Sequence, residues 1–223
     1  MVDMREEIRT FIGASHPSEP MKLWIPTFRS TGGGVPSPAD KSFSFPGRVS
    51  SFRDIIALSY IFARIDDVQT NDSIRIVSAT DTHTSEHELG ISFIIGGRSN
   101  PMTLDVLASK TVKNFFKLEC HTEWKILCNG GGVVYSIRNP GEMTKTEYEN
   151  SVDYGFIQKT YNKRNKALFI VSGLGSRATA GCGLFFYDNW HELYEKYGSE
   201  PFGIVIKFPP ERLKERPSIV WMS

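Results

Sequence analysis

Residues 91–103 read Ile-Ser-Phe-Ile-Ile-Gly-Gly-Arg-Ser-Asn-Pro-Met-Thr, and this stretch decides the expected fold class. A short apolar run without charges ends at two glycines, small polar residues follow, and apolar residues then recur at helical spacing over residues 104–109. That order predicts a buried strand, a tight loop and a helix. Because glycine lacks a Cβ atom, Gly96 and Gly97 allow the backbone to turn sharply and to lie close to a ligand.

A second stretch repeats this pattern. The apolar residues 167–172 are followed by Gly173, Leu174, Gly175 and Ser176 before another helical segment. Ligands of parallel sheets bind beyond the carboxyl ends of the strands, and free N–H groups at a helix start attract anions. If the two strands are neighbours, their loops line one crevice. The predicted ligand-binding residues are Gly96, Gly97, Arg98, Ser99, Asn100, Thr103, Gly173, Gly175, Ser176 and Arg177.

Arg98 and Arg177 each lie beside a glycine turn, where a guanidinium group can pair with two oxygens of a phosphate or carboxylate. The alternative is that both are surface arginines, and that the glycines serve only tight turns and the packing of helices on strands. Both interpretations stay open at the level of the sequence.

The other segments complete an α/β pattern. Helices are expected over residues 4–12 and 51–65, the second opening with the capping-box spacing of Ser51 and Asp54. Strands are expected over residues 21–28, 73–79, 154–160, 202–208 and 218–221, and a small antiparallel insertion over 115–137. We therefore predict a three-layer, Rossmann-like α/β domain with a mainly parallel sheet over residues 21–223, preceded by a leader or helix over 1–20.

Composition excludes several classes of protein. The 223 residues carry a net charge of +1 and no run of five basic residues, so no extended nucleic-acid surface is indicated. No apolar run approaches the roughly 20 residues of a membrane span. Three cysteines without C-x-x-C spacing favour a reduced compartment, and the charged first residues do not resemble a signal peptide, so a cytoplasmic protein is expected. The oligomeric state stays open.

The polar residues 81–88, Asp-Thr-His-Thr-Ser-Glu-His-Glu, are the best candidates for chemistry. Glu86 or Glu88 would serve as general base or nucleophile toward a bound nucleoside. His83, Glu86 and His87 have the H-x-x-E-H order of some zinc proteases, but no firm helix or further ligand accompanies them. A solvated loop is the default interpretation and no metal site is predicted, whereas the question of a cofactor stays open.

Residues 95–100 with Thr103, residues 153–157, and residues 172–175 with Thr179 together resemble an uncharacterised group of small prokaryotic Rossmann-like proteins. Those proteins pair a strand–Gly-Gly-x-x-Asn turn with a later strand–Gly–helix. The resemblance covers about residues 50–210 and implies the fold and the crevice, without a known activity. The glycine-rich strand ends are also similar, more loosely, to nucleotide-sensing and nucleoside-deoxyribosyltransferase-like domains, whose glutamate nucleophile has no assigned counterpart here.

The function predicted first is a binding or sensing domain for a nucleotide-derived or other anionic small molecule. The alternatives are an enzyme that cleaves an N-glycosidic bond with Glu86 or Glu88, and a structural scaffold whose glycines shape turns only.

Overall fold

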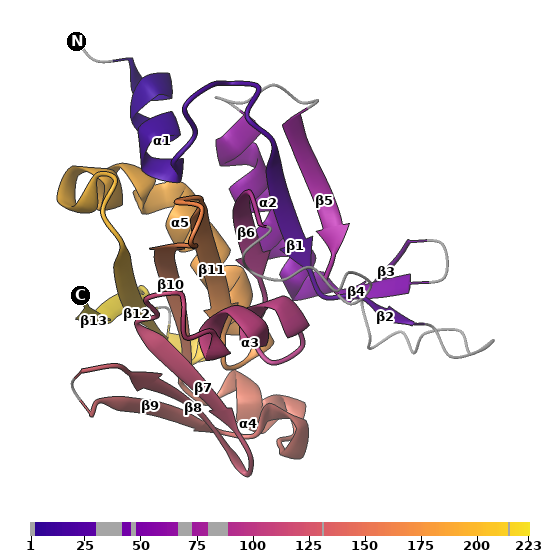
Figure 1. The fold of residues 1–223 in the computed structure, drawn as a ribbon. Helices are drawn as coiled ribbons and strands as arrows, with labels where there is room; N and C mark the ends of the chain where they lie inside the picture. Colours follow the sequence, from indigo (N-terminus) through magenta and orange to yellow (C-terminus); the bar gives the residue numbers. More distant parts are fainter. Residues whose placement is uncertain are drawn as a thin grey trace.

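The structure, a computed structural model, describes residues 3–29, 42–45, 48–66, 73–79, 89–130, 132–213 and 215–223 (Figure 1). Its centre is a seven-stranded sheet with the strand order β13-β12-β10-β11-β6-β1-β5. The strands of this sheet are β1 (Met21–Ile25), β5 (Ile74–Ser78), β6 (Ile91–Ile95), β10 (Asp153–Tyr161), β11 (Ala167–Gly173), β12 (Phe202–Phe208) and β13 (Ser218–Met222).

Five of the seven strands point in the same direction. The pairs β5–β1, β1–β6 and β6–β11 are parallel, whereas β10 is antiparallel to both β11 and β12, and β13 is antiparallel to β12. The turn at residues 162–166 explains the reversal at β10, because a parallel crossover needs a dozen or more residues and a hairpin needs only a few. A mostly parallel α/β sheet is therefore confirmed.

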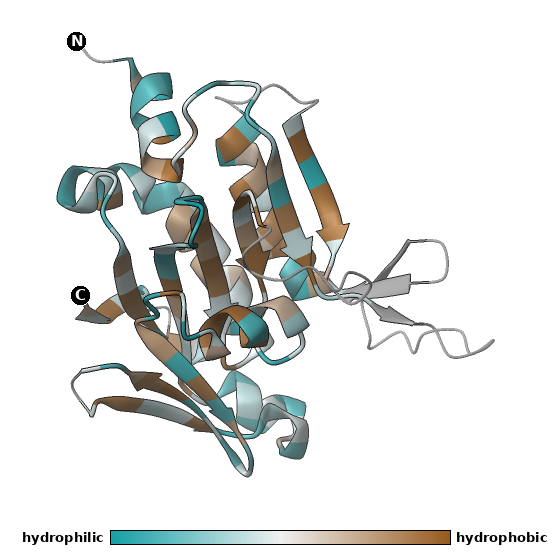
Figure 2. Ribbon diagram, viewed as in Figure 1, coloured by the Kyte–Doolittle hydropathy of each residue, from teal (hydrophilic) through white to brown (hydrophobic). Residues whose placement is uncertain are grey.

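Three helices cover one face of the sheet: α1 (Met4–Ile12), α2 (Phe52–Asp66) and α5 (Ser176–Tyr197). Helix α1 belongs to this core, since Phe11 is fully buried and its ring stacks on Phe186 and Phe202 at centroid distances of 6.0 and 5.8 Å. The strands beneath are strongly hydrophobic, and polar residues face outward on α1 (Figure 2).

The opposite face is covered differently. Helix α3 (Pro101–Ala108) packs there beside a three-stranded antiparallel sheet of β7 (Phe116–Cys120), β8 (Glu123–Cys128) and β9 (Val134–Arg138). This sheet is the predicted antiparallel insertion, and Figure 1 shows it in front of the central strands. A short 3-10 turn, η3 (Pro140–Glu142), and helix α4 (Lys145–Glu149) lead from it into β10, and a second turn, η4 (Glu211–Leu213), follows β12. Because a sheet shares this face with α3, the three-layer Rossmann-like arrangement is not confirmed.

A third small sheet precedes α2 and was not predicted from the sequence. It pairs β4 (Arg48–Ser51) antiparallel with β2 (Phe28–Arg29) and β3 (Ser42–Phe45).

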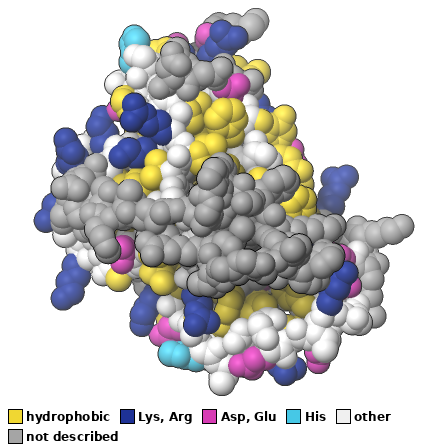
Figure 3. Space-filling model, turned by 90° about the vertical axis from the view of Figure 1, so that its right-hand side faces the viewer, with side chains coloured by type: hydrophobic (Ala, Val, Ile, Leu, Met, Phe, Trp, Pro, Cys, Tyr) yellow, Lys and Arg dark blue, Asp and Glu magenta, His cyan; other side chains and the backbone are white. Residues whose placement is uncertain are grey.

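Hydrophobic side chains lie at the surface on the side of the molecule where β5 forms the edge of the central sheet (Figure 3), and Ile76 of β5 is 49% exposed. Over the residues that the structure describes, no helix has the length and apolar character that crossing a membrane requires.

Candidate functional site

The two predicted glycine-ended strands are neighbours. Strands β6 and β11 pair in parallel from Ser92 and Leu168 to Ile95 and Val171, and the Gly96 amide donates a hydrogen bond of 3.0 Å to the Val171 carbonyl. Helix α3 follows β6 on one face of the sheet, while α5 follows β11 on the other. Adjacent parallel strands whose helices leave on opposite faces open a crevice between their carboxyl ends, which is where α/β proteins bind ligands.

A cavity of about 520 Å³ lies at this point, and we call it the β6–β11 crevice. Its volume falls within the range of small-molecule sites, about 300–1,000 Å³. The predicted residues that line it come from both loops: Gly97, Arg98, Ser99, Gly173, Gly175 and Ser176. Its remaining lining residues include Asp54 of α2, Trp124 of β8 and Tyr148 of α4.

The glycine pair serves both the turn and the crevice. Gly96 has a φ of +99°, which L side chains rarely adopt, so a residue without Cβ is needed there. A Cβ atom on Gly97 would lie 2.8 Å from the Gly173 carbonyl oxygen and 2.9 Å from the Ser172 hydroxyl. The two loops therefore approach each other more closely than side chains would allow, and the backbone of Gly97 forms part of the crevice wall.

Asn100 and Thr103 are used inside the fold. The Asn100 amide donates to the Ile95 and Trp24 carbonyls at 2.8 and 3.3 Å, and its side-chain oxygen accepts the Met102 N–H as the N-cap of α3. The Thr103 hydroxyl donates to the Gly96 carbonyl at 2.6 Å. Both side chains are fully buried, and neither lines the crevice. Their role as ligand contacts stays a prediction, and what the structure shows is that they hold the turn.

Arg98 is placed at the crevice surface. Its guanidinium group lies over the half-buried ring of Trp124, 5.5 Å from the ring centroid. Arg98 forms no salt bridge with any residue that the structure describes. The crevice thus carries a positive charge and an aromatic surface on the wall opposite α2.

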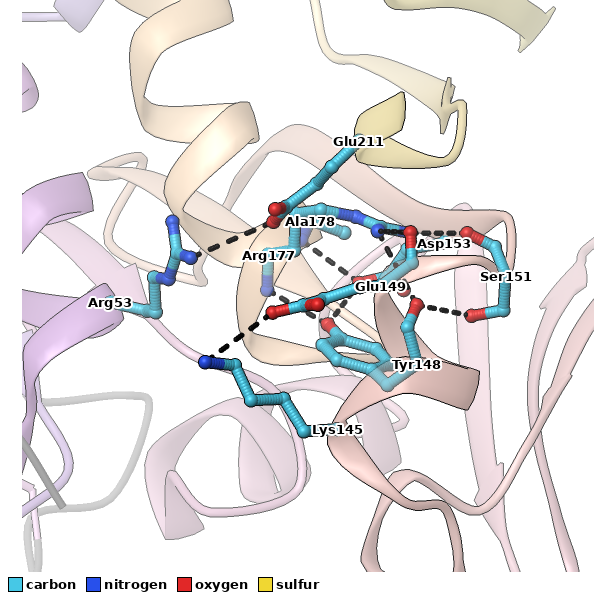
Figure 4. A network of polar contacts seen from close by, with 9 residues as sticks. All are labelled: Arg53, Lys145, Tyr148, Glu149, Ser151, Asp153, Arg177, Ala178 and Glu211. Atoms are coloured by element: carbon cyan, nitrogen blue, oxygen red, sulfur yellow. Dashed lines mark hydrogen bonds and ion pairs between the residues drawn. The ribbon is translucent and has the colours of Figure 1, made fainter. Parts of the chain in front are cut away.

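Backbone N–H groups at the start of α5 donate hydrogen bonds to a carboxylate of the protein itself. Asp153, the fully buried first residue of β10, accepts hydrogen bonds from the N–H groups of Gly175 and Ala178, both at 3.0 Å, and from the Tyr148 hydroxyl at 2.6 Å (Figure 4). Burial raises the pKa of the Asp153 carboxyl, and these hydrogen bonds oppose the rise. An exogenous anion was predicted at this helix start, where Asp153 already accepts hydrogen bonds from the N–H groups of Gly175 and Ala178.

Arg177 also serves the fold. Its guanidinium group donates to three carbonyls of α4 and the residues after it, the shortest bond being 2.6 Å to Ser151, and it lies over the Tyr148 ring at 5.1 Å (Figure 4). The Arg177 amide donates to the Tyr148 hydroxyl. Arg177 does not line the crevice, and its side chain is 8% exposed. Arg177 lines a different cavity, of about 700 Å³, together with residues of α2 and α5. Binding of a ligand by Arg177 stays a prediction.

Asp54 was missed as a site residue. In a capping box its carboxylate would accept the backbone N–H of Ser51, but Asp54 forms no hydrogen bond or salt bridge with any described residue, so the capping-box prediction is not supported. It lines the crevice instead, is 4% exposed, and burial raises its pKa to about 7. One sequence signal existed: Asp54 shares the helical face of Leu58, Ile61 and Ile65, all of them buried.

The proposed catalytic residues cannot be placed. Glu86 and Glu88, with His83 and His87, lie outside the described residues, as does the glycine-rich stretch 30–39. Within the described ranges, no three histidine, cysteine, aspartate or glutamate side chains gather as a metal site would require. The three cysteines are free thiols, and burial raises the pKa of both Cys128 and Cys182.

Comparison with known proteins found no matching family model, no similar curated protein and no similar solved structure. The functional argument therefore rests on the geometry of the crevice.

Proposed function

We propose that this chain is a binding or sensing domain for a nucleotide-derived anionic small molecule, which it holds in the β6–β11 crevice. The observation that carries the proposal is that one cavity of about 520 Å³ is lined by two glycine turns from distant parts of the sequence together with Arg98. We also propose that the domain is a Rossmann-like variant in which the β7–β9 sheet takes the place of helices on one face.

The residues that line the crevice offer a ligand several kinds of contact. Arg98 supplies a guanidinium group for a phosphate or carboxylate, in the bidentate geometry that arginine favours. Trp124 supplies an aromatic surface and Ser99 supplies a hydroxyl, whereas the Ser176 hydroxyl interacts with that of Tyr148. The Ser176 amide has no acceptor among the described residues, so one N–H group at the start of α5 is left for a ligand.

Cleavage of an N-glycosidic bond remains the alternative function. It would need a carboxylate at the ligand, and Glu86 and Glu88 lie outside the described residues. A scaffold role is the third alternative, since Gly96 and Gly97 are also required by the turn itself.

The test is a thermal-shift screen of the chain with nucleoside phosphates, nucleosides, NAD and sugar phosphates, followed by mass spectrometry of each mixture. A ligand present at 100 times its Kd stabilises the native state by about 2.7 kcal/mol, which gives a clear shift. We expect stabilisation by a phosphate-bearing ligand that is recovered intact. Recovery of free base and sugar would establish the enzyme instead.

Arg98→Ala provides the site test, with Arg164→Ala as its matched control, because Arg164 is exposed in the turn at the opposite end of β11. Loss of a charged hydrogen-bonding partner should weaken binding about tenfold or more in Arg98→Ala. Arg164→Ala should bind as the wild-type chain does. Equal binding by all three proteins, or no shift with any compound, would reject the proposal.

A further inference from the structure

Two carboxyl groups, those of Asp54 and Asp153, are buried in the described part of the chain, and their surroundings differ. The Asp153 carboxylate accepts four hydrogen bonds, from the Tyr148 hydroxyl and from the backbone N–H groups of Tyr154, Gly175 and Ala178. Asp54 is also buried, with 4% of its surface exposed, but its carboxyl group accepts no hydrogen bond from any described residue. Buried polar groups are ordinarily hydrogen-bonded. The Asp54 oxygens are not among the fully enclosed side-chain atoms that lack a partner, so they are reached from the crevice that Asp54 lines, where a ligand can bind them.

Packing does not require an aspartate here. Asp54 lies on the face of α2 that packs against α5 and the central sheet, in line with Leu58 and Ile61. An apolar residue would satisfy that face without the desolvation of a carboxyl group. Its place in the first turn of α2 favours a negative charge through the helix dipole, but a dipole does not substitute for hydrogen bonds.

The charged neighbours of Asp54 do not neutralise it. Arg53, on the same helix, is directed to Glu211 at 3.8 Å, and Arg177 is bound to the carbonyls near α4. Arg98 lines the same crevice, yet Asp54 and Arg98 form no salt bridge with each other. Among the described residues, the crevice therefore presents a guanidinium and a carboxyl group that each lack a salt-bridge partner.

We propose that the Asp54 carboxyl binds an N–H group of the crevice ligand, and that this ligand joins a planar nitrogen heterocycle bearing an amino group to an anionic group. The proposal rests on the proposed function and specifies its ligand class. The anionic group pairs with Arg98, the ring lies along Trp124, and the amino group donates to Asp54. An aminated nucleobase carrying a phosphate has all three features, whereas a sugar phosphate has only the first.

The experiment measures binding by isothermal titration calorimetry for matched nucleotides. AMP is compared with purine riboside 5′-monophosphate, and CMP with UMP, because one member of each pair bears an exocyclic amino group and its partner does not. Ribose 5-phosphate reports binding of the anion alone. The proteins are the wild-type chain, Asp54→Ala, Asp54→Asn and the control Asp105→Ala. The control removes a carboxylate that is exposed on α3.

We expect the wild-type chain and Asp105→Ala, at pH 8 where the Asp54 carboxyl is ionised, to bind at least one amino-bearing nucleotide about tenfold more tightly than its partner, the effect of one hydrogen bond to a charged acceptor. Asp54→Ala should bring that ratio to within about twofold without weakening the binding of ribose 5-phosphate, because the change removes a negative charge from the crevice. Asp54→Asn keeps the shape of the side chain and covers the case in which Asp54→Ala does not fold. It removes the charge but keeps one acceptor oxygen, so it should lower the ratio less than Asp54→Ala does.

Two results would overturn the proposal, and they differ in what they leave standing. If the wild-type chain binds nucleotides and the ratio survives in both Asp54 variants, the role of Asp54 is refuted while the proposed function stands. If the wild-type chain binds none of the five compounds, the proposed function fails and the role of Asp54 fails with it.

Discussion

Replacing Asp54 with asparagine should change how the stability of the protein depends on pH. Burial raises the pKa of the folded-state carboxyl from its ordinary value of 3.8 to about 7. Between these two pH values the folded state keeps a proton that the unfolded chain has lost, so unfolding releases a proton. The free energy of unfolding of the wild-type chain should therefore fall as the pH rises through this window, and Asp54→Asn should lack that component.

The size of the effect follows from the same numbers. One pH unit of difference in pKa corresponds to 1.36 kcal/mol, so a rise from 3.8 to about 7 amounts to about 4 kcal/mol. The total free energy of unfolding of a small domain is about 5–15 kcal/mol, so a change of this size is readily measured.

The assay is urea denaturation of the wild-type chain, Asp54→Asn and the control Asp105→Asn at several pH values between 4 and 8. The stability of the wild-type chain relative to Asp54→Asn should fall by about 4 kcal/mol across this range, whereas the difference from Asp105→Asn should stay nearly constant. Taking differences removes the contributions of other titrating groups. If the free energies of unfolding of the wild-type chain and Asp54→Asn change with pH in the same way, the pKa of the Asp54 carboxyl is not raised by burial, which would refute this prediction.

Three further predictions concern stability. Asp153→Ala removes the acceptor of the α5 N–H groups and should lower the free energy of unfolding by about 3–5 kcal/mol in urea; a loss below 1 kcal/mol would contradict the role of Asp153. Burial lowers the pKa of Lys159 to about 7, so the stability of the wild-type chain relative to Lys159→Met should rise between pH 7 and 10, and a constant difference would refute this. Gly97→Ala places a Cβ atom 2.8 Å from the Gly173 carbonyl oxygen and should lower the stability by about 1–3 kcal/mol and weaken binding in the crevice; an unchanged melting temperature would show that the loops separate easily.

Much of the fold follows from local patterns. The apolar residues of β6 are all buried, the glycine pair forms the turn after it, and the following helix begins at Pro101, just after the glycine turn. The helices α1 and α2 also match their predicted spans closely. These features depend on side chains only a few residues apart, so the sequence carries them directly.

The composition of the crevice was predicted in part for the same reason. A strand that ends in glycines before a helix places its loop at the carboxyl edge of a sheet, and this brought Gly97, Arg98 and Gly173 to one cavity. The parallel pairing of β6 with β11 was an assumption at that point, since nothing local fixes which strands become neighbours.

The line between what the sequence alone determined and what only the tertiary structure decided is seen at the polar side chains around the crevice, namely Asp54, Asn100, Asp153 and Arg177. The sequence determined the strands of the central sheet, the glycine turns and the residue types at the strand ends, but not the small sheet of β2, β3 and β4. Asp153 lies 22 residues before the amide of Gly175 that it binds, and Arg177 reaches the carbonyl of Ser151, so their partners come from packing. Whether a polar side chain binds the protein or faces the crevice depends on which backbone groups the fold brings within hydrogen-bond distance, and that is settled by the whole arrangement of strands and helices.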